Sequence, residues 1–232
     1  MRKSETIEED PGAAGGRTGS PARGGRIGPR GARCPAPGRR RLNVPTKASV
    51  IPKEFPFVAA VSASKKHDFT KESREDVVLL SGLGVVEDAH CGACVQHLYD
   101  IARHPTRPNL RQVHLLEHEL LDELQRLGFD LKPGALGENI TTRNLPLLEL
   151  KAGSLLQIGR NAILRVTGLR KPCVKIGRLG KGLQAAVTMR GERFAFMKGA
   201  VMAVVIAGGK VSPGNAIRVQ QPAGTTKFLQ PV

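Results

Sequence analysis

The sequence lacks any apolar run long enough to cross a membrane. Its longest one, GAVMAVVIAGG at residues 199–209, is bounded by glycines at both ends, and it is far shorter than the roughly 20 residues that a membrane-spanning helix needs. The N-terminus also lacks the apolar segment that follows the positive charges of a secretory signal. We therefore expect a cytoplasmic protein without a membrane partner.

Cysteine is scarce as well, because the 232 residues contain only four. So few cysteines do not make a disulfide framework in a chain of this size. Cys91 and Cys94 form a C-x-x-C pair, but a structural zinc site needs a second pair of ligands, and Cys34 and Cys173 are each single. A thioredoxin-like dithiol would need a βαβ context, which the pattern lacks. We interpret the pair as coincidental, with a zinc or dithiol site as the less favoured alternative.

Acidic residues are few in the first quarter of the chain. Residues 1–53 contain 12 of the 36 Lys and Arg but 4 of the 20 Asp and Glu, so they carry +8 of the net charge of +16. Most of this segment is Gly, Pro, Arg and Ala, which cannot offset the entropy cost of ordering. We expect a disordered tail without a specific partner. Nucleic acid is the alternative partner, through this tail alone, because phosphate contacts need only charge.

The remaining sequence predicts one mainly β domain with a few helices, an α+β barrel or sandwich, over residues 54–222, followed by a C-terminal tail at 223–232. Short apolar runs separated by glycine-rich turns are typical of such folds. A helical period over residues 117–128 ends at Gly128, although one long helix starting at Leu110 is an alternative. The expected strands lie at 55–64, within 73–88, and at 112–116, 139–142, 154–159, 162–168, 200–209 and 216–221.

Two polar stretches could carry chemistry. In KPGALGENITT, residues 132–142, glycines permit close approach of backbone amides to a ligand, and Glu138, Asn139 and Thr141 could hydrogen-bond a polar heterocycle. On composition alone, an ordinary polar loop is favoured. In VTGLRKPCVKIG, residues 166–177, cations surround Cys173, which would favour the thiolate that attacks electrophiles and binds soft metals. The alternative is an inert, buried thiol.

Seven segments in this order closely resemble the MOSC domain family, which is named for the C-terminal domain of molybdenum cofactor sulfurase. They are GLGVVEDAH, VQH, PNLRQVHL, PGALGENITT, LLEL-x-x-GSLLQIG, VTGLRKPC and GAVMAVVIAGGKVSPGNAI. The resemblance covers about residues 56–222 and is strongest to the small single-domain members. Its most specific feature is the joint occurrence of GENIT and TGLR-x-PC, since either motif alone is weak.

The resemblance implies a β-barrel-like fold that binds the molybdenum–pterin cofactor. Cys173 would be the thiolate ligand to the metal, and a soft thiolate suits molybdenum. The cofactor carries a phosphate, which gives a role to the neighbouring cations Arg170 and Lys171. The family pattern would place two further segments in the same pocket. They contribute Gly137, Glu138, Asn139 and Thr141 from GENIT, and Asp88 and His90 from DAH.

The chain departs from the family pattern at several positions. Where family members read close to GVEGDAHAG, this chain reads GVVEDAHCG, so that Glu87 replaces a glycine and Cys91 is additional. Lys171 replaces a neutral amide beside Cys173, and Leu98 stands where an arginine commonly follows VQH. We expect Glu87 to change the loop conformation around His90.

The small members of the family are thought to reduce N-hydroxylated compounds such as hydroxylamino-purines. The resemblance therefore implies a molybdenum-dependent oxidoreductase, in which Cys173 holds the metal and His90 or Asp88 delivers protons. No segment resembles a flavin, nicotinamide or iron–sulfur site, so an external reductase should supply electrons. Pyridoxal phosphate is not expected, because the chain is too short for the domain that binds it. A persulfide-carrying sulfur relay at Cys173 and a non-enzymatic binding module are the alternatives.

Overall fold

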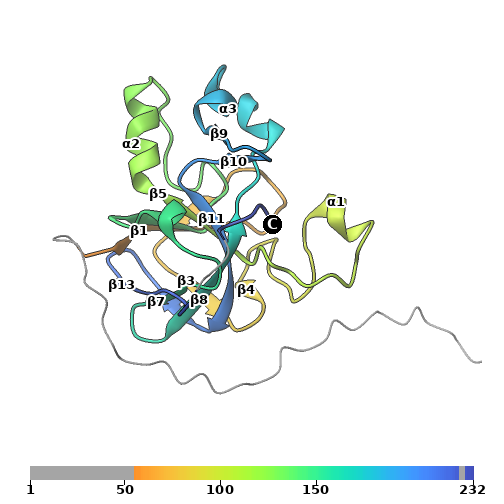
Figure 1. Cartoon of the computed structure of the whole chain (residues 1–232), viewed down its shortest axis with the longest axis vertical. Helices are drawn as coiled ribbons and strands as arrows, with labels where there is room; N and C mark the ends of the chain where they lie inside the picture. The colour runs from red at the N-terminus through yellow and green to blue at the C-terminus, as the bar shows by residue number, and fades with distance from the viewer. Residues whose placement is uncertain (1–54, 225–227) are drawn as a thin grey trace, which may run out of the picture. The chain divides into compact units, whose positions relative to one another are not determined.

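The computed structural model describes residues 55–224 and 228–232 (Figure 1). The tail predicted at 1–53, with its possible nucleic-acid contacts, lies outside these residues. Within them no helix is both long and apolar enough to cross a membrane.

The largest element is a sheet of eight strands in the order β13-β7-β8-β11-β5-β6-β1-β2, which curls into a half-barrel. All neighbouring strands are antiparallel except β5 and β6, which are parallel. Backbone hydrogen bonds between the start of β1 and the turn before β13 help to close the curl, as in Val58 N to Asn215 O at 2.9 Å. The strands are β1 Phe57–Ala63, β2 Glu72–Arg74, β5 Val113–Glu117, β6 Ile140–Arg143, β7 Leu155–Ile158, β8 Ala162–Leu169, β11 Ala200–Ala207 and β13 Ile217–Gln220.

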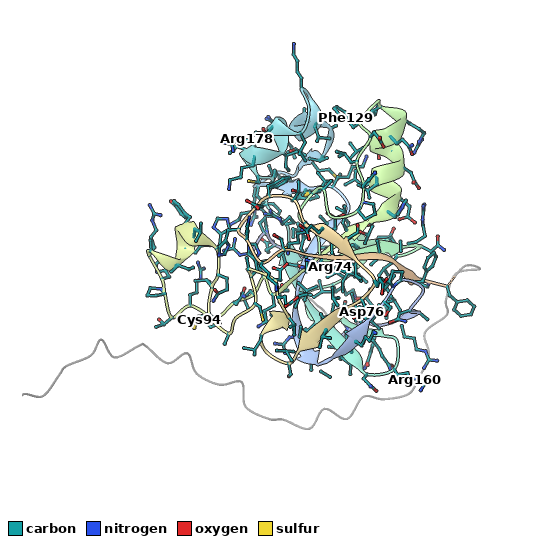
Figure 2. All side chains as sticks on the ribbon, turned by 180° about the vertical axis from the view of Figure 1, so that it is seen from behind. Arg74, Asp76, Cys94, Phe129, Arg160 and Arg178 are labelled. Atoms are coloured by element: carbon teal, nitrogen blue, oxygen red, sulfur yellow. The ribbon has the colours of Figure 1, made fainter. Side chains whose placement is uncertain are left out.

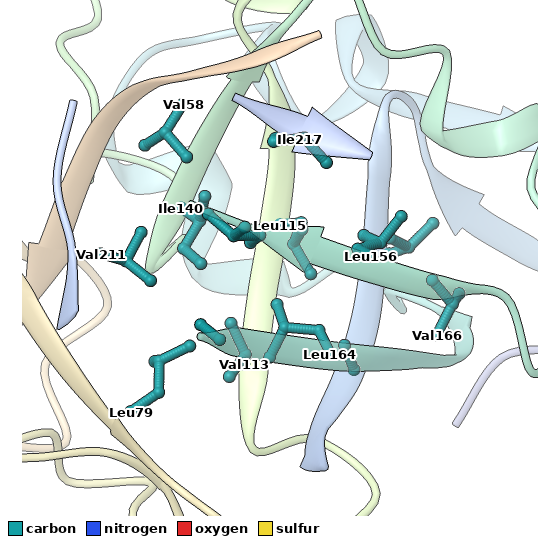
Figure 3. Packing of buried hydrophobic residues seen from close by; sticks show 14 of the residues in the cluster. Val58, Leu79, Val113, Leu115, Ile140, Leu156, Leu164, Val166, Val211 and Ile217 are labelled. Atoms are coloured by element: carbon teal, nitrogen blue, oxygen red, sulfur yellow. The ribbon is translucent and has the colours of Figure 1, made fainter. Parts of the chain in front are cut away.

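A smaller sheet, in the order β12-β3-β4, completes the main hydrophobic core. It consists of β12 Gly209–Val211, β3 Val77–Leu80 and β4 Gly84–Val85. Alternate residues of β3 are buried, so Leu79 packs with Leu115 of β5 and Leu164 of β8 (Figure 3). Burying side chains of this size contributes about 1.5–3 kcal/mol each.

A second cluster of buried side chains lies under the helices. It joins Leu120, Leu121 and Leu124 of α2 (His118–Arg126) to Ile176 of the 3-10 helix η2 (Val174–Arg178) and Leu183 of α3 (Leu183–Ala186). Figure 2 shows Phe129, which follows α2, and Arg178, which ends η2, at the same end of the protein. The remaining elements are α1 Leu98–Ile101, η1 Leu147–Glu149 and the hairpin of β9 Thr188–Arg190 with β10 Ala195–Met197.

The predicted fold class is confirmed, since the protein is mainly β with a few helices. Strand β5 followed by helix α2 also confirms the strand-then-helix interpretation over one long helix from Leu110. Leu127, which follows the last helical residue Arg126, is 58% exposed. The described end of the expected C-terminal tail pairs with β8. Here Leu169 N donates to Gln230 O at 2.8 Å, and Leu229 is buried.

Candidate functional site

One cavity brings together residues from six separate segments of the chain. Its volume is about 220 Å³. The cavity is lined by five of the residues that the sequence analysis predicted for the site, namely His90, Gly137, Asn139, Arg170 and Cys173. The motifs DAH, GENIT and TGLR-x-PC, which are far apart in the sequence, therefore meet at one place.

Strand β8 and the turn that follows it position Cys173. Backbone bonds anchor Arg170 beside β10 and β11, because Arg170 O accepts from Met197 N at 2.8 Å and Arg170 N donates to Ala200 O at 3.3 Å. Cys173 then precedes η2, where its carbonyl accepts from Ile176 N at 3.0 Å. The thiol is free and half-buried, and it packs against the second hydrophobic cluster. The turn therefore holds a thiol in the cavity wall rather than deep in the core.

Asp88 lies beside the cavity and organises its neighbours. Its carboxylate is 1% exposed, and Oδ2 accepts from Lys71 Nζ at 2.6 Å and from Asn139 Nδ2 at 2.9 Å. Oδ1 accepts from His90 N at 3.0 Å and lies 3.2 Å from His90 Nδ1. One buried carboxylate thus connects three residues that line the cavity.

The pKa values follow from this burial and pairing. Burial alone would raise the pKa of Asp88, but the His90 hydrogen bond and the Lys71 ammonium outweigh it and hold the pKa well below its usual range. Asp88 is therefore ionised at neutral pH. Burial lowers the pKa of His90 more than the Asp88 hydrogen bond raises it, which leaves the imidazole neutral at pH 7. Burial also lowers the pKa of Lys71, against the attraction of Asp88.

The GENIT loop owes its shape to a buried carboxylate and to two glycines. Glu138 accepts from Gly134 N at 2.7 Å, from Leu136 N at 3.2 Å and from Thr141 Oγ1 at 3.3 Å. Gly137 has φ +83°, and a Cβ there would lie 2.7 Å from Phe69 O. Only glycine fits that position, so the backbone of Gly137 itself forms cavity wall.

Several expected site residues lie away from the cavity surface. Glu138 and Thr141 are fully buried and shape the loop from behind. Lys171 is exposed and does not line the cavity, although its carbonyl accepts from Arg170 Nη1 at 2.9 Å. Its contribution to the site is therefore a backbone contact that positions Arg170.

Glu87 adopts the left-handed conformation that a glycine would take. Its φ is +60°, which costs a residue with a side chain roughly 1–2 kcal/mol. The loop nevertheless keeps its hydrogen bonds, with Asp88 N donating to Val85 O at 3.2 Å and Ala89 N to Ser64 O at 2.7 Å. The side chain of Glu87 pairs at the surface with Lys65 Nζ at 2.8 Å. Our expectation that Glu87 changes the loop around His90 relative to the family pattern stays a prediction.

Sequence reasoning missed several polar residues of the cavity wall, and these include Lys71, His97, Arg111 and His114. Lys71 lies in the loop between β1 and β2, and Arg111 forms an ion pair with Asp100 beside α1. His114 is the second residue of β5, and its neighbours Val113 and Leu115 are both buried. A polar side chain within a continuously buried strand was the signal that could have identified it.

The C-x-x-C pair forms no recognisable metal site. Across residues 55–224 and 228–232, no group of three or more His, Cys, Asp or Glu side chains could hold a metal ion. Cys91 is a free thiol whose pKa is raised by burial and by Asp88, so it is not an activated nucleophile.

The curled sheet and its cavity define a β-rich domain with one thiol, several cations and several histidines facing a common space. The family model described as MOSC domain matches residues 97–218, which is more than half of the chain. The chain therefore belongs to the MOSC domain family. A comparison with curated protein sequences gave no match.

Solved structures share the fold. The YuaD protein from Bacillus subtilis superimposes with a TM-score of 0.59 and 21% identity, over 73% of this chain and 98% of that one. YiiM from Geobacillus stearothermophilus gives a TM-score of 0.52 and 18% identity, over 72% of this chain and 75% of that one. YiiM from Escherichia coli gives 0.50 and 19%, over 74% and 73%. At this level of identity, the likeness establishes the fold alone.

Proposed function

We propose that this protein binds the molybdenum–pterin cofactor through Cys173 and reduces N-hydroxylated compounds such as hydroxylamino-purines. The observation that carries the proposal is the meeting of Cys173, Arg170 and the GENIT loop in one cavity. MOSC domains are associated with this cofactor, and the family match supports assigning it here.

The residues present fit such a group. The cofactor supplies its own sulfur ligands to the metal, so one thiol in a wall is enough, and Cys173 is free and half-buried there. Arg170 and Cys173 line the same cavity, and burial lowers the pKa of the Arg170 guanidinium, although a negative charge at Cys173 would raise it. A guanidinium suits the phosphate of the pterin, because it donates two parallel hydrogen bonds. His114 Nε2 in the same wall is buried without a partner.

Bound molybdenum would supply the two-electron chemistry that removes oxygen from an N–OH group, which leaves amine and water. The chain's own residues would bind, orient and exchange protons. Cys173 would hold the metal through its sulfur, and Arg170 would hold the anionic end of the cofactor. Lys71 and Asp88 would fix the ring of His90 at the cavity wall.

His90 is the better candidate for proton delivery, and Asp88 positions it. The ionised Asp88 has no proton to give at neutral pH, because its pKa is held low. It accepts from His90 Nδ1, so Nε2 of the neutral ring is free to take up a proton and pass it to the substrate. The Asp88 carboxylate also stabilises the imidazolium when that proton arrives.

Electrons would come from an external reductase. We found no sequence pattern for a flavin, a nicotinamide or an iron–sulfur cluster, and the described residues contain no multi-ligand metal group that could store electrons. The reductase is therefore part of the proposal, together with a small N-hydroxylated substrate.

The test compares Cys173→Ala with Cys91→Ala after expression in cells that make the cofactor. Both residues are free, half-buried thiols, but only Cys173 lines the cavity, so Cys91→Ala is a matched control. We expect wild type and Cys91→Ala to contain molybdenum and pterin near one per chain, and Cys173→Ala to lose both metal and hydroxylamine reduction. Retention of both by Cys173→Ala would refute the ligand assignment.

The same preparation tests the sulfur relay. One observation favours such a relay, because the Cys173 thiol is accessible in a cation-lined cavity that also suits a persulfide. Sulfane sulfur in the intact wild-type protein, without pterin or molybdenum, would favour the relay over the reductase.

A further inference from the structure

His114 lines the cavity and is the second residue of β5. It pairs across the sheet with Met202 of β11, which also lines the cavity. His114 is only 4% exposed. Its backbone is fully bonded to Asn139, because His114 N donates to Asn139 Oδ1 at 3.1 Å and His114 O accepts from Asn139 N at 2.8 Å. The position of the ring is therefore fixed by the same loop that carries the GENIT motif.

One nitrogen of this ring has no partner. Among the residues described, only three buried side-chain atoms lack a hydrogen bond, and His114 Nε2 is the one that belongs to the cavity wall. An orphaned buried polar atom costs free energy that an ordinary core residue would avoid. A histidine kept for packing alone would be expected to have both nitrogens bonded or in contact with water.

The protonation of the ring identifies what this nitrogen can do. Burial and the nearby Arg170 lower the pKa of His114 well below its usual range, so the ring is neutral. The backbone of Gly137 raises the pKa, which is the effect of a carbonyl that accepts a ring N–H, since an amide donor would lower it. Because Nε2 is unbonded, Nδ1 is the donor, and Nε2 carries a free lone pair.

We infer that His114 binds the occupant of the cavity, with Nε2 accepting a hydrogen bond from an N–H or O–H group of that molecule. Two molecules of the proposed function carry such a donor, the pterin of the cofactor and the hydroxylamino-purine substrate. The inference rests on the proposed function in taking this cavity as their binding site. The surrounding cations attract the anionic part of a ligand, while Nε2 of His114 accepts a hydrogen bond from a neutral donor on the ligand's ring.

The test separates the two nitrogens by substitution. In His114→Asn, the side-chain amide can still donate to the Gly137 carbonyl from the position of Nδ1, but nothing replaces Nε2. In His114→Gln, the side-chain oxygen reaches the position of Nε2 and restores an acceptor. Ser62→Ala is the control, because Ser62 Oγ is also buried without a hydrogen-bond partner but does not line the cavity.

Three quantities are measured for each variant. They are pterin per chain after expression in cofactor-producing cells, the dissociation constant of 6-hydroxylaminopurine by calorimetry, and the melting temperature. We expect His114→Asn to reduce pterin content or purine affinity roughly 10-fold, the size of one hydrogen bond in a desolvated site. His114→Gln should recover most of that loss, and Ser62→Ala should show none. A fall in pterin content identifies the cofactor as the bound group, and a fall in purine affinity alone identifies the substrate.

Wild-type behaviour of His114→Asn in both binding measurements would overturn the inference. If that variant unfolds, nitrogen-15 NMR spectra of the wild type test instead whether His114 Nε2 binds the ligand. Nε2 of His114 must show an unprotonated resonance that shifts on adding pterin or the purine, and an unchanged resonance with both overturns the inference. Wild-type protein without pterin or molybdenum would refute the proposed function, while the purine measurements would still test His114.

Discussion

Replacing Lys71 by methionine should leave a buried carboxylate without its charged partner. The side chains of Lys71 and Asp88 are 4% and 1% exposed, and their Nζ–Oδ2 distance is 2.6 Å. Removing one partner of such a pair costs about 3–5 kcal/mol. Neutral donors from His90, Asn139 and the backbone of Ser64 remain on the carboxylate, so we expect the free energy of unfolding to fall by about 3 kcal/mol, the lower end of that range. Urea denaturation at pH 7 measures the change.

The pH dependence of the free energy of unfolding provides a second test of this prediction. Because the folded-state pKa of Asp88 lies below its unfolded value, its stabilising contribution is present above about pH 4 and is lost as the pH falls further. Without Lys71 the pKa of the buried carboxyl should rise, so the stability gap between wild type and variant should narrow as the pH is lowered. A gap that stays constant down to pH 3 would contradict the assigned charge state.

The matched control is Lys65→Met. Lys65 pairs with Glu87 at 2.8 Å, but the two side chains are 67% and 60% exposed, and such surface pairs contribute about 0–1 kcal/mol. The double variant Lys71→Met/Asp88→Asn should be more stable than Lys71→Met alone, because it leaves no unpaired charge. Equal losses from Lys65→Met and Lys71→Met would refute the reasoning.

Three further predictions follow from the site. Glu87→Gly should raise the free energy of unfolding by about 0.5–1 kcal/mol in urea, since it relieves a φ of +60°, and a loss would contradict the strain. Gly137→Ala should lower the melting temperature more than Gly153→Ala, because both have positive φ but only the first Cβ meets a carbonyl, Phe69 O at 2.7 Å. If His90 delivers the proton, hydroxylamine reduction should rise as the pH falls below about 6.5, and His90→Gln should flatten that profile.

Hydrophobic period was enough to predict most of the sheet. Strand β8 alternates between buried and less buried residues over most of its length, and the onset of the helical period after Val113–Glu117 marks where β5 becomes α2. Elements of three or four residues, such as α1, α3 and the β9–β10 hairpin, are too short to show any period. Their structure depends on tertiary contacts that no local pattern encodes.

The candidate site likewise contains residues that sequence motifs predict and residues that only the three-dimensional structure reveals. Residues within motifs, such as Cys173 and Asn139, could be proposed from the sequence, and both line the cavity. Lys71 and His114 belong to no motif that we recognised, and their importance depends on contacts made in three dimensions. The bond between Lys71 and Asp88 crosses from one loop to another, and the unpartnered Nε2 of His114 is visible only once its surroundings are known.

Glu87 stands at a loop position whose backbone conformation favours glycine. A glycine-to-glutamate replacement predicts a different loop, because the left-handed conformation is unfavourable for a residue with a Cβ. The loop is held from its other side, however, since the Asp88 carboxylate accepts five hydrogen bonds from Ser64, Lys71, His90 and Asn139. Together these contacts offset a strain of roughly 1–2 kcal/mol, so the loop holds Glu87 in the left-handed conformation. The hydrogen bonds around the Asp88 carboxylate therefore set the backbone conformation that Glu87 adopts.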